Sequence, residues 1–284
     1  MICICVDDFG MHAGINEAAL RLAGMNRVHA ISCLVGGMSW TGWSRVLRRL
    51  DAPDVDIGLH LDLTETPLLD GSRRPLRDLI LDSVLRRLDR RIIRAEIRAQ
   101  LDAFEQALGR APAFVDGHQH VHQFRTVRTE LLEELQARYR GSTPWIRSTR
   151  TPRAGCRSIN MLGRDCLKPR GIEWLGSRGL ASAAYRLGYP QNRHLLGVYD
   201  FEGGSSRYRE LLARWLLAAV DGDLLMCHPS TPTHGNDSLI DARHAEFEVL
   251  SSASFDAGLH DADVQLRPMS QILARRMSMP QTSE

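Results

Sequence analysis

Two adjacent carboxylates, Asp7 and Asp8, follow a short apolar run that starts at the beginning of the chain. The run is typical of a buried strand, and two neighbouring acids at its end are costly unless a cation lies against them. These acids could cap a following helix. Alternatively, one of them binds a cation, and its neighbour, kept ionised by that charge, acts as a general base.

Histidines stand at the ends of other strand-like runs. Residues 55–63 alternate between apolar and polar types, so His60 and Asp62 should project to the same side of one strand. His60 could equally be a core histidine with satisfied hydrogen bonds. His228 ends a further apolar run, and the proline after it holds it in extended geometry. Carboxylates and imidazoles gathered in this way indicate a metal site.

A denser cluster, His118, His120 and His122, comes directly after the short apolar run 113–116. If the strand continues, all three imidazoles project to one side, which requires a metal ion or an acid nearby. If the chain has already turned, only one or two of them reach the site, and the remainder bind substrate or orient a ligand. In either case we expect at least one of the three to bind a metal ion.

Strand and helix patterns alternate along the chain. We expect strands at residues 2–8, 28–35, 55–63, 113–116 and 224–227, and helices at 14–22, 40–50, 76–108, 126–139, 208–220 and 241–250. This alternation predicts an α/β fold with parallel strands and crossover helices. The site should then lie beyond the carboxyl ends of the strands, at the mouth of a barrel.

Composition excludes several classes of protein. The net charge of +2 gives no support for nucleic-acid binding, and no apolar stretch approaches the length of a membrane span. None of the six cysteines forms a C-x-x-C pair, which is typical of buried, reduced thiols. With no signal peptide ahead of the first strand, we expect a cytoplasmic location.

Four motifs together resemble the YdjC-like carbohydrate deacetylases, the family that includes the ChbG and HpnK types. They are Val6-Asp7-Asp8-Phe9-Gly10, Gly58-Leu59-His60-Leu61-Asp62-Leu63-Thr64, Asp116-Gly117-His118-Gln119-His120-Val121-His122 and Met226-Cys227-His228-Pro229. The resemblance implies a distorted TIM-like (β/α) barrel. It also implies a single domain over residues 1–284. Within it, the many Gly, Pro and Arg residues at about 140–200 predict an irregular, loop-rich segment, and the C-terminal tail after Met277 is expected to be frayed.

The resemblance further implies the roles of individual residues. One divalent metal ion, magnesium or zinc, would be held by Asp8, His60 and His118. Asp7 would be the general base and His228 the general acid in the hydrolysis of an N-acetyl group from an amino sugar. Asp62, His120 and His122 would bind substrate or orient the ligands. The partner would be a small carbohydrate or sugar conjugate, and a homodimer is expected at the level of the family.

Two other functions are compatible with the same residues. The His118-x-His120 pattern is also found in binuclear amidohydrolases and phosphoesterases, although in amidohydrolases that pattern follows the first strand, where this chain has Asp7-Asp8. A non-catalytic sugar-binding protein on the same scaffold should lack a ligand or the base, and neither is missing.

Overall fold

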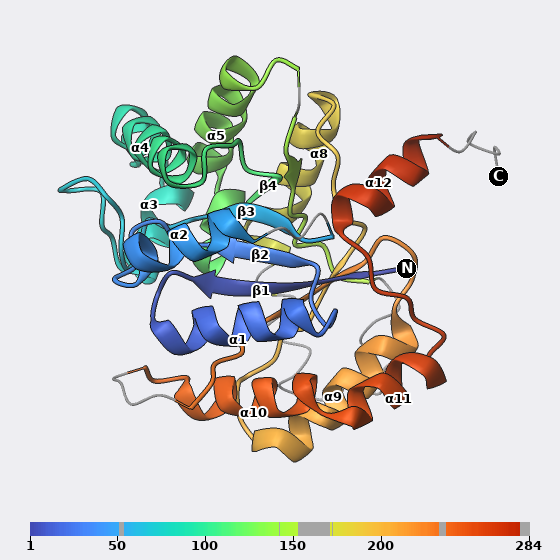
Figure 1. Cartoon of the computed structure of the whole chain (residues 1–284). Helices are drawn as coiled ribbons and strands as arrows, with labels where there is room; N and C mark the ends of the chain where they lie inside the picture. Colours follow the sequence, from blue (N-terminus) through green and yellow to red (C-terminus); the bar gives the residue numbers. More distant parts are fainter. Residues whose placement is uncertain (51–53, 142, 153–170, 172, 233–236, 279–284) are drawn as a thin grey trace.

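The computed structural model describes residues 1–50, 54–141, 143–152, 171, 173–232 and 237–278. Seven parallel strands form one sheet in the order β5-β4-β3-β2-β1-β7-β6. The strands are β1 (Cys3–Phe9), β2 (Ala30–Cys33), β3 (Asp56–Leu61), β4 (Phe114–Gly117), β5 (Trp145–Ile146), β6 (Leu195–Leu196) and β7 (Leu224–Cys227). Figure 1 shows β1 and β2 ending on the same side of the molecule.

The sheet curves into a distorted barrel. Its two edges approach each other, because an isolated parallel bridge joins Ile146, at the end of β5, to Gln191, shortly before β6. The backbone N–H of Leu195 also donates to the carbonyl of Arg150. The expected distorted (β/α) barrel is therefore confirmed.

Helices cover the outside of the sheet (Figure 1). They are α1 (Ala13–Gly24), α2 (Trp40–Arg49), α3 (Leu76–Val84), α4 (Arg90–Leu108), α5 (Arg125–Arg138), α8 (Arg178–Arg186), α9 (Gly204–Ala218), α10 (Ile240–Ser251), α11 (Ala253–Asp261) and α12 (Met269–Ser278), with short 3₁₀ and π turns at His118–Gln123 and Glu173–Ser177. None of the described helices is both long enough and apolar enough to cross a bilayer.

The prediction of one helix over residues 76–108 was wrong. The helix is interrupted between α3 and α4. There Arg86 has φ +58°, and Asp89 accepts a hydrogen bond from the backbone N–H of Arg91. A left-handed residue followed by a helix-capping aspartate ends one helix and starts the next. Residues 142, 153–170 and 172 of the expected irregular segment lie outside the described residues, as do 279–284 of the expected frayed tail.

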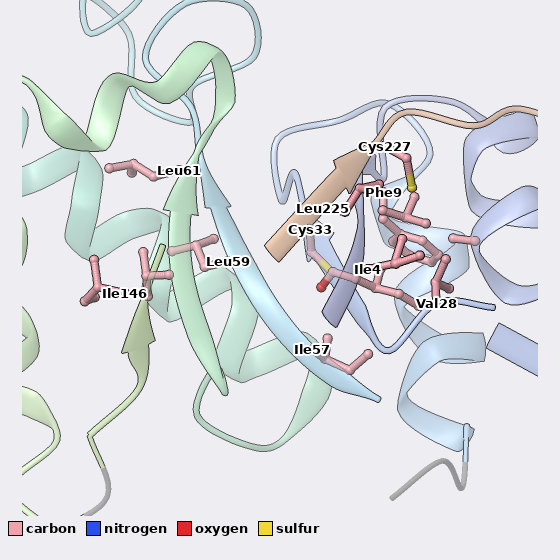
Figure 2. Packing of buried hydrophobic residues seen from close by; sticks show 14 of the residues in the cluster. Ile4, Phe9, Val28, Cys33, Ile57, Leu59, Leu61, Ile146, Leu225 and Cys227 are labelled. Carbon is pink, nitrogen blue, oxygen red and sulfur yellow. The ribbon is translucent and has the colours of Figure 1, made fainter. Parts of the chain in front are cut away.

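The alternation of side chains along each strand separates two cores. The helix-facing core contains Ile4 and Val6 of β1 and, as Figure 2 shows, Ile57, Leu59 and Leu61 of β3. A second cluster fills the barrel with Cys3, Cys5, Ala30, Phe114, Trp145, Leu224 and Met226. Residues of α12 close the amino-terminal end of the barrel, because Met269, Ile272 and Leu273 belong to this same cluster. The carboxyl-terminal end remains available for polar groups.

Candidate metal and catalytic site

A bulge at the end of β1 turns both opening carboxylates toward the barrel. Asp7 continues the inward-facing series of Cys3 and Cys5, so Asp8 in a regular strand would face the helices. Instead, the pairing register with β2 shifts between Val6 and Phe9, and Asp8 has φ +67°. Asp7 and Asp8 are 2% and 1% exposed, so the bulge places two buried acids at one point of the barrel mouth.

Asp8 lies against imidazoles from two other strands. Its Oδ1 is 3.0 Å from Nδ1 of His118 and 3.3 Å from Nε2 of His60. One donor atom from each of the three residues lies within 4.8 Å of the others. Separations of about 3 Å match those between ligands that share a cation at about 2.1 Å, so the three groups fit one divalent ion.

Buried acids orient His60. Its Nδ1 lies 2.7 Å from Oδ1 of Asp116 and 3.0 Å from Oγ of Ser32. Burial lowers the pKa of His60, but Asp116, together with Asp7 and Asp8, raises it overall to about 9. The proton on Nδ1 is fixed by Asp116, so Nε2 is the nitrogen directed at Asp8 and free to bind a cation.

Arg147, a fully buried arginine, binds the carboxylate of Asp7. Arg147 donates to Oδ2 and Oδ1 of Asp7, both at 2.6 Å, and lies 2.5 Å from Oδ2 of Asp116. It also contacts Sγ of Cys5 at 3.0 Å. Burial raises the pKa of Asp7, but the Arg147 guanidinium outweighs it and holds that pKa well below its usual range. Asp7 is therefore ionised at neutral pH even without a metal ion.

Arg243 of α10 fixes the orientation of Asp8. Its Nη2 donates to Oδ2 of Asp8 at 2.7 Å, and its Nε is 2.6 Å from Oδ2 of Asp237. Asp237 is 3.2 Å from Nε2 of His12. Because Arg243 occupies Oδ2, Asp8 offers the two imidazoles only its Oδ1, which is the arrangement of a monodentate ligand.

The chain turns immediately after His118. β4 ends at Gly117, and Gln119 and His120 have φ +51° and +59°. His118 and His120 line the cavity described below, whereas His122 is fully buried and donates from Nε2 to the carbonyl of Arg147 at 3.0 Å. Of the two arrangements open from the sequence, the turned chain is correct, and His122 lies behind the site.

Asp62 organises the loop after β3. Its carboxylate accepts hydrogen bonds from the backbone N–H groups of Thr64, Glu65 and Thr66 and from both threonine hydroxyls. Burial raises the pKa of Asp62, but His118 and these hydrogen bonds lower it overall. Within the part of the chain that the structure describes, Asp116 rather than Asp62 is hydrogen-bonded to the imidazole of His60. Asp62 thus shapes the loop that carries Glu65, and Oε1 of Glu65 lies 3.2 Å from Nε2 of His118.

His228 follows β7 and lies beside Asp7, with its Nε2 4.0 Å from Oδ2 of Asp7. Behind it, Glu246 of α10 accepts hydrogen bonds from the backbone N–H of His228 and, at 2.8 Å, from the hydroxyl of Tyr199. Burial lowers the pKa of His228 to about 4 and raises that of Glu246 to about 7. The imidazole of His228 is therefore neutral at pH 7.

A cavity of about 1030 Å³ opens over these groups. Its polar floor is formed by Asp7, Asp8, His60, His118, His120 and His228. Much of its wall is apolar and is formed by Met11, Leu76, Leu175, Phe201, Leu239 and Ile240. A cavity of this size accommodates a sugar ring together with an attached group.

Sequence reasoning missed several residues at this site. Asp116 faces inward from the four-residue strand β4, and Arg147 directly follows β5, a two-residue strand that leaves no periodic pattern to find. Arg243 and Glu246 are buried polar residues three positions apart on α10. A charged pair at helical spacing among apolar residues was the available signal, but solvated helix faces show the same pattern.

Sequence relatives cover nearly the whole chain. A sequence model of the YdjC-like protein family matches residues 1–261. A human carbohydrate deacetylase is 29% identical over 312 residues, covering 96% of this chain and 91% of the relative. A mouse carbohydrate deacetylase is 30% identical over 320 residues, covering 96% and 95%.

Solved structures share the fold. A protein of Enterococcus faecalis, whose suggested role is cellobiose-phosphate cleavage, has a TM-score of 0.64 at 17% identity and covers 96% of this chain and 98% of its own. A family 4 acetyl xylan esterase from Clostridium thermocellum, solved with cobalt, has a TM-score of 0.52 at 10% identity, with 97% and 91% covered. At these identities the likeness concerns the fold alone. The extent of the family match shows that the chain belongs to the YdjC-like protein family.

Proposed function

We propose that this chain is a carbohydrate deacetylase that hydrolyses the N-acetyl group of an amino sugar or of an amino-sugar conjugate. Two relatives along nearly the full chain are named carbohydrate deacetylases. The observation that carries the proposal is the division of labour between the two acids at the bulge. Asp8 faces two imidazoles, while Asp7 faces Arg147 and the open cavity.

The proposed cofactor is one divalent cation, magnesium or zinc, held by Asp8, His60 and His118. Bound there, it would supply Lewis-acid polarisation of the acetamide carbonyl and of the attacking water. One carboxylate oxygen and two imidazole nitrogens are compatible with either metal. Because Arg243 donates to Oδ2 of Asp8, only Oδ1 would be offered to the cation, which would leave positions for substrate.

Protons are handled by Asp7 and His228. Asp7, kept ionised by Arg147, accepts a proton as the water oxygen bonds to the acetyl carbon. The carbon–nitrogen bond then breaks, and the leaving amine needs a proton. His228 is neutral at pH 7, and its Nε2 lies 4.0 Å from Asp7, so it relays the proton taken up by Asp7 to that amine. The products are acetate and a free amino sugar.

The remaining residues of the candidate set have supporting roles in this proposal. His120 lines the cavity and contacts substrate, whereas His122 supports the backbone of Arg147. Asp62 holds the loop at the mouth. Phe201 packs edge-on against His228, with ring centroids 5.2 Å apart, and offers an apolar surface to a sugar ring.

The structure gives little support to the binuclear alternative. Cys5, Asp7 and Asp116 form a second set of candidate metal ligands. The guanidinium of Arg147 already contacts all three side chains. A fixed cation therefore occupies the place that a second metal ion would need.

Acetate release from metal-loaded protein tests the proposal. Substrates should include N-acetylated chitooligosaccharides and N-acetylglucosamine conjugates. Asp7→Asn should bind metal normally and lose activity by on the order of 10²–10⁴-fold, whereas Asp78→Asn, on the exposed side of α3, should not. No acetate from any substrate would overturn the proposal, and full activity of Asp7→Asn would remove Asp7 from its role as the base.

A further inference from the structure

The short helix α3 is apolar on two opposite faces. Its inner face packs into the protein through Leu79, which is completely buried. Its outer face carries Leu81, Val84 and Leu85, which are 54%, 64% and 46% exposed. These three residues are spaced i, i+3 and i+4, so they form one continuous stripe. A helix that is apolar on both faces normally has both faces covered.

Arginines surround the end of this stripe. Arg86, Arg87 and Arg91 lie in the turn between α3 and α4 and in the first turn of α4, and all three are exposed. Within the part of the chain that the structure describes, none of them forms an ion pair. The nearby acid Asp89 is engaged as the cap of α4. Ile92, 40% exposed, adds a further exposed apolar side chain in the first turn of α4.

The α3–α4 turn belongs to the same end of the barrel as the site. Leu76, the first residue of α3, lines the cavity. In Figure 1, α3 and the loop before it stand at the side where β1 and β2 end. Val84 is eight residues further along the helix, or about 12 Å at 1.5 Å per residue.

We propose that the α3–α4 turn is a docking surface for an anionic lipid membrane. Apolar side chains flanked by arginines are the composition of interfacial membrane-binding segments, in which the side chains enter the headgroup region and the guanidinium groups bind phosphates. The charge argues against a second copy of the chain as the occupant. A two-fold contact through this stripe would bring Arg86, Arg87 and Arg91 toward their own counterparts, with Asp89 already engaged.

Vesicle sedimentation with the full chain tests this docking independently of catalysis. The vesicles are phosphatidylcholine alone and phosphatidylcholine mixed with phosphatidylglycerol. The chain should partition onto the anionic vesicles and be released by salt. Arg86→Gln/Arg87→Gln/Arg91→Gln should bind on the order of 100-fold more weakly, at about fivefold per arginine. Val84→Ser/Leu85→Ser should also lose binding, by about tenfold or more.

Matched controls lie on other faces of the molecule. Arg209→Gln/Arg275→Gln/Arg276→Gln removes the same charge from α9 and α12, and Leu217→Ser removes a side chain that is 71% exposed on α9. Both controls should bind vesicles like the unaltered chain. Thermal unfolding and acetate release from a soluble substrate verify that each variant is folded.

Three outcomes would overturn the inference. The first is equal partitioning onto neutral and anionic vesicles, or none onto either. The second is an equal loss of binding in the charge-matched control. The third is a dimer, seen by light scattering, that Val84→Ser/Leu85→Ser dissociates, because a second copy would then cover the stripe.

Discussion

Replacing Arg147 by methionine removes the guanidinium that lies between Asp7 and Asp116. In the unaltered chain, Arg147 contacts both oxygens of Asp7 and one oxygen of Asp116 at 2.5–2.6 Å, and all three side chains are buried. Methionine keeps much of the volume but leaves buried carboxylates without a cation. Breaking such a pair costs about 3–5 kcal/mol, a large part of the stability of a typical domain.

The sign of the pH dependence makes the prediction specific. In the unaltered chain, the pKa of Asp7 is depressed, so its contribution to stability is present above its unfolded value of 3.8 and is lost only at more acidic pH. In Arg147→Met, the largest charge that opposes burial is removed, so the pKa of Asp7 rises above the unfolded value. The folded variant then gains stability as the pH falls, by about 1.4 kcal/mol for each unit through which Asp7 takes up its proton. The difference between the two proteins should therefore shrink between pH 8 and pH 5.

Urea unfolding of chelator-treated protein at both pH values measures this difference. Histidines remote from Arg147 cancel from it, whereas His120 and His122, whose pKa values burial and Arg147 both lower, shrink the difference in the same direction. Arg27→Met is a matched control, because Arg27 is 9% exposed but its partner Asp256 is an exposed acid, at 2.6 Å. The control should cost about 1 kcal/mol at either pH. A loss for Arg147→Met below 1 kcal/mol at pH 8, or one that is equal or larger at pH 5, would refute the reasoning.

Three further substitutions test neighbouring parts of the structure. Glu246 has a pKa raised from 4.5 to about 7, so it loses a stabilising proton between pH 5 and pH 8. Over that range the free energy of unfolding of Glu246→Gln, measured in urea, should rise by about 2–3 kcal/mol relative to that of the unaltered chain. A pH-independent difference would contradict this. Asp62→Ala should lower the free energy of unfolding by about 2–4 kcal/mol, since three backbone N–H groups lose their acceptor, and a change below 1 kcal/mol in thermal unfolding would exclude this role. Gly58→Ala should cost about 1–3 kcal/mol, because a Cβ there would lie 2.5 Å from the ring of Phe114, whereas Gly42→Ala, with no atom within 4 Å, should not destabilise.

Strand ends and their histidines could be predicted because they follow period-two patterns. His60 projects inward from β3, as the alternation of residues 55–63 indicates, and His118 comes where β4 ends. The proximity of Asp8 to both imidazoles was expected from the family resemblance rather than from the pattern. Strict alternation places Asp8 on the helix side of β1, and only its φ of +67° returns it to the site.

Other features carried no usable local signal. Arg147 stands after a two-residue strand, and its partners come from β1 and β4, so its burial depends on the closed barrel. The break before α4 depends on Arg86, a residue type for which a left-handed conformation is not anticipated. The homodimer, the cytoplasmic location and the single-domain assignment stay predictions.

Metal content per chain tests the central claim most directly. After equilibration with zinc or magnesium and removal of free ions, the unaltered chain should hold one ion. Asp8→Asn and His60→Ala should each bind it at least tenfold more weakly by calorimetry, whereas His260→Gln, exposed on α11, should bind it unchanged. Two ions per chain, or full metal affinity in Asp8→Asn, would contradict a single cation held between Asp8, His60 and His118.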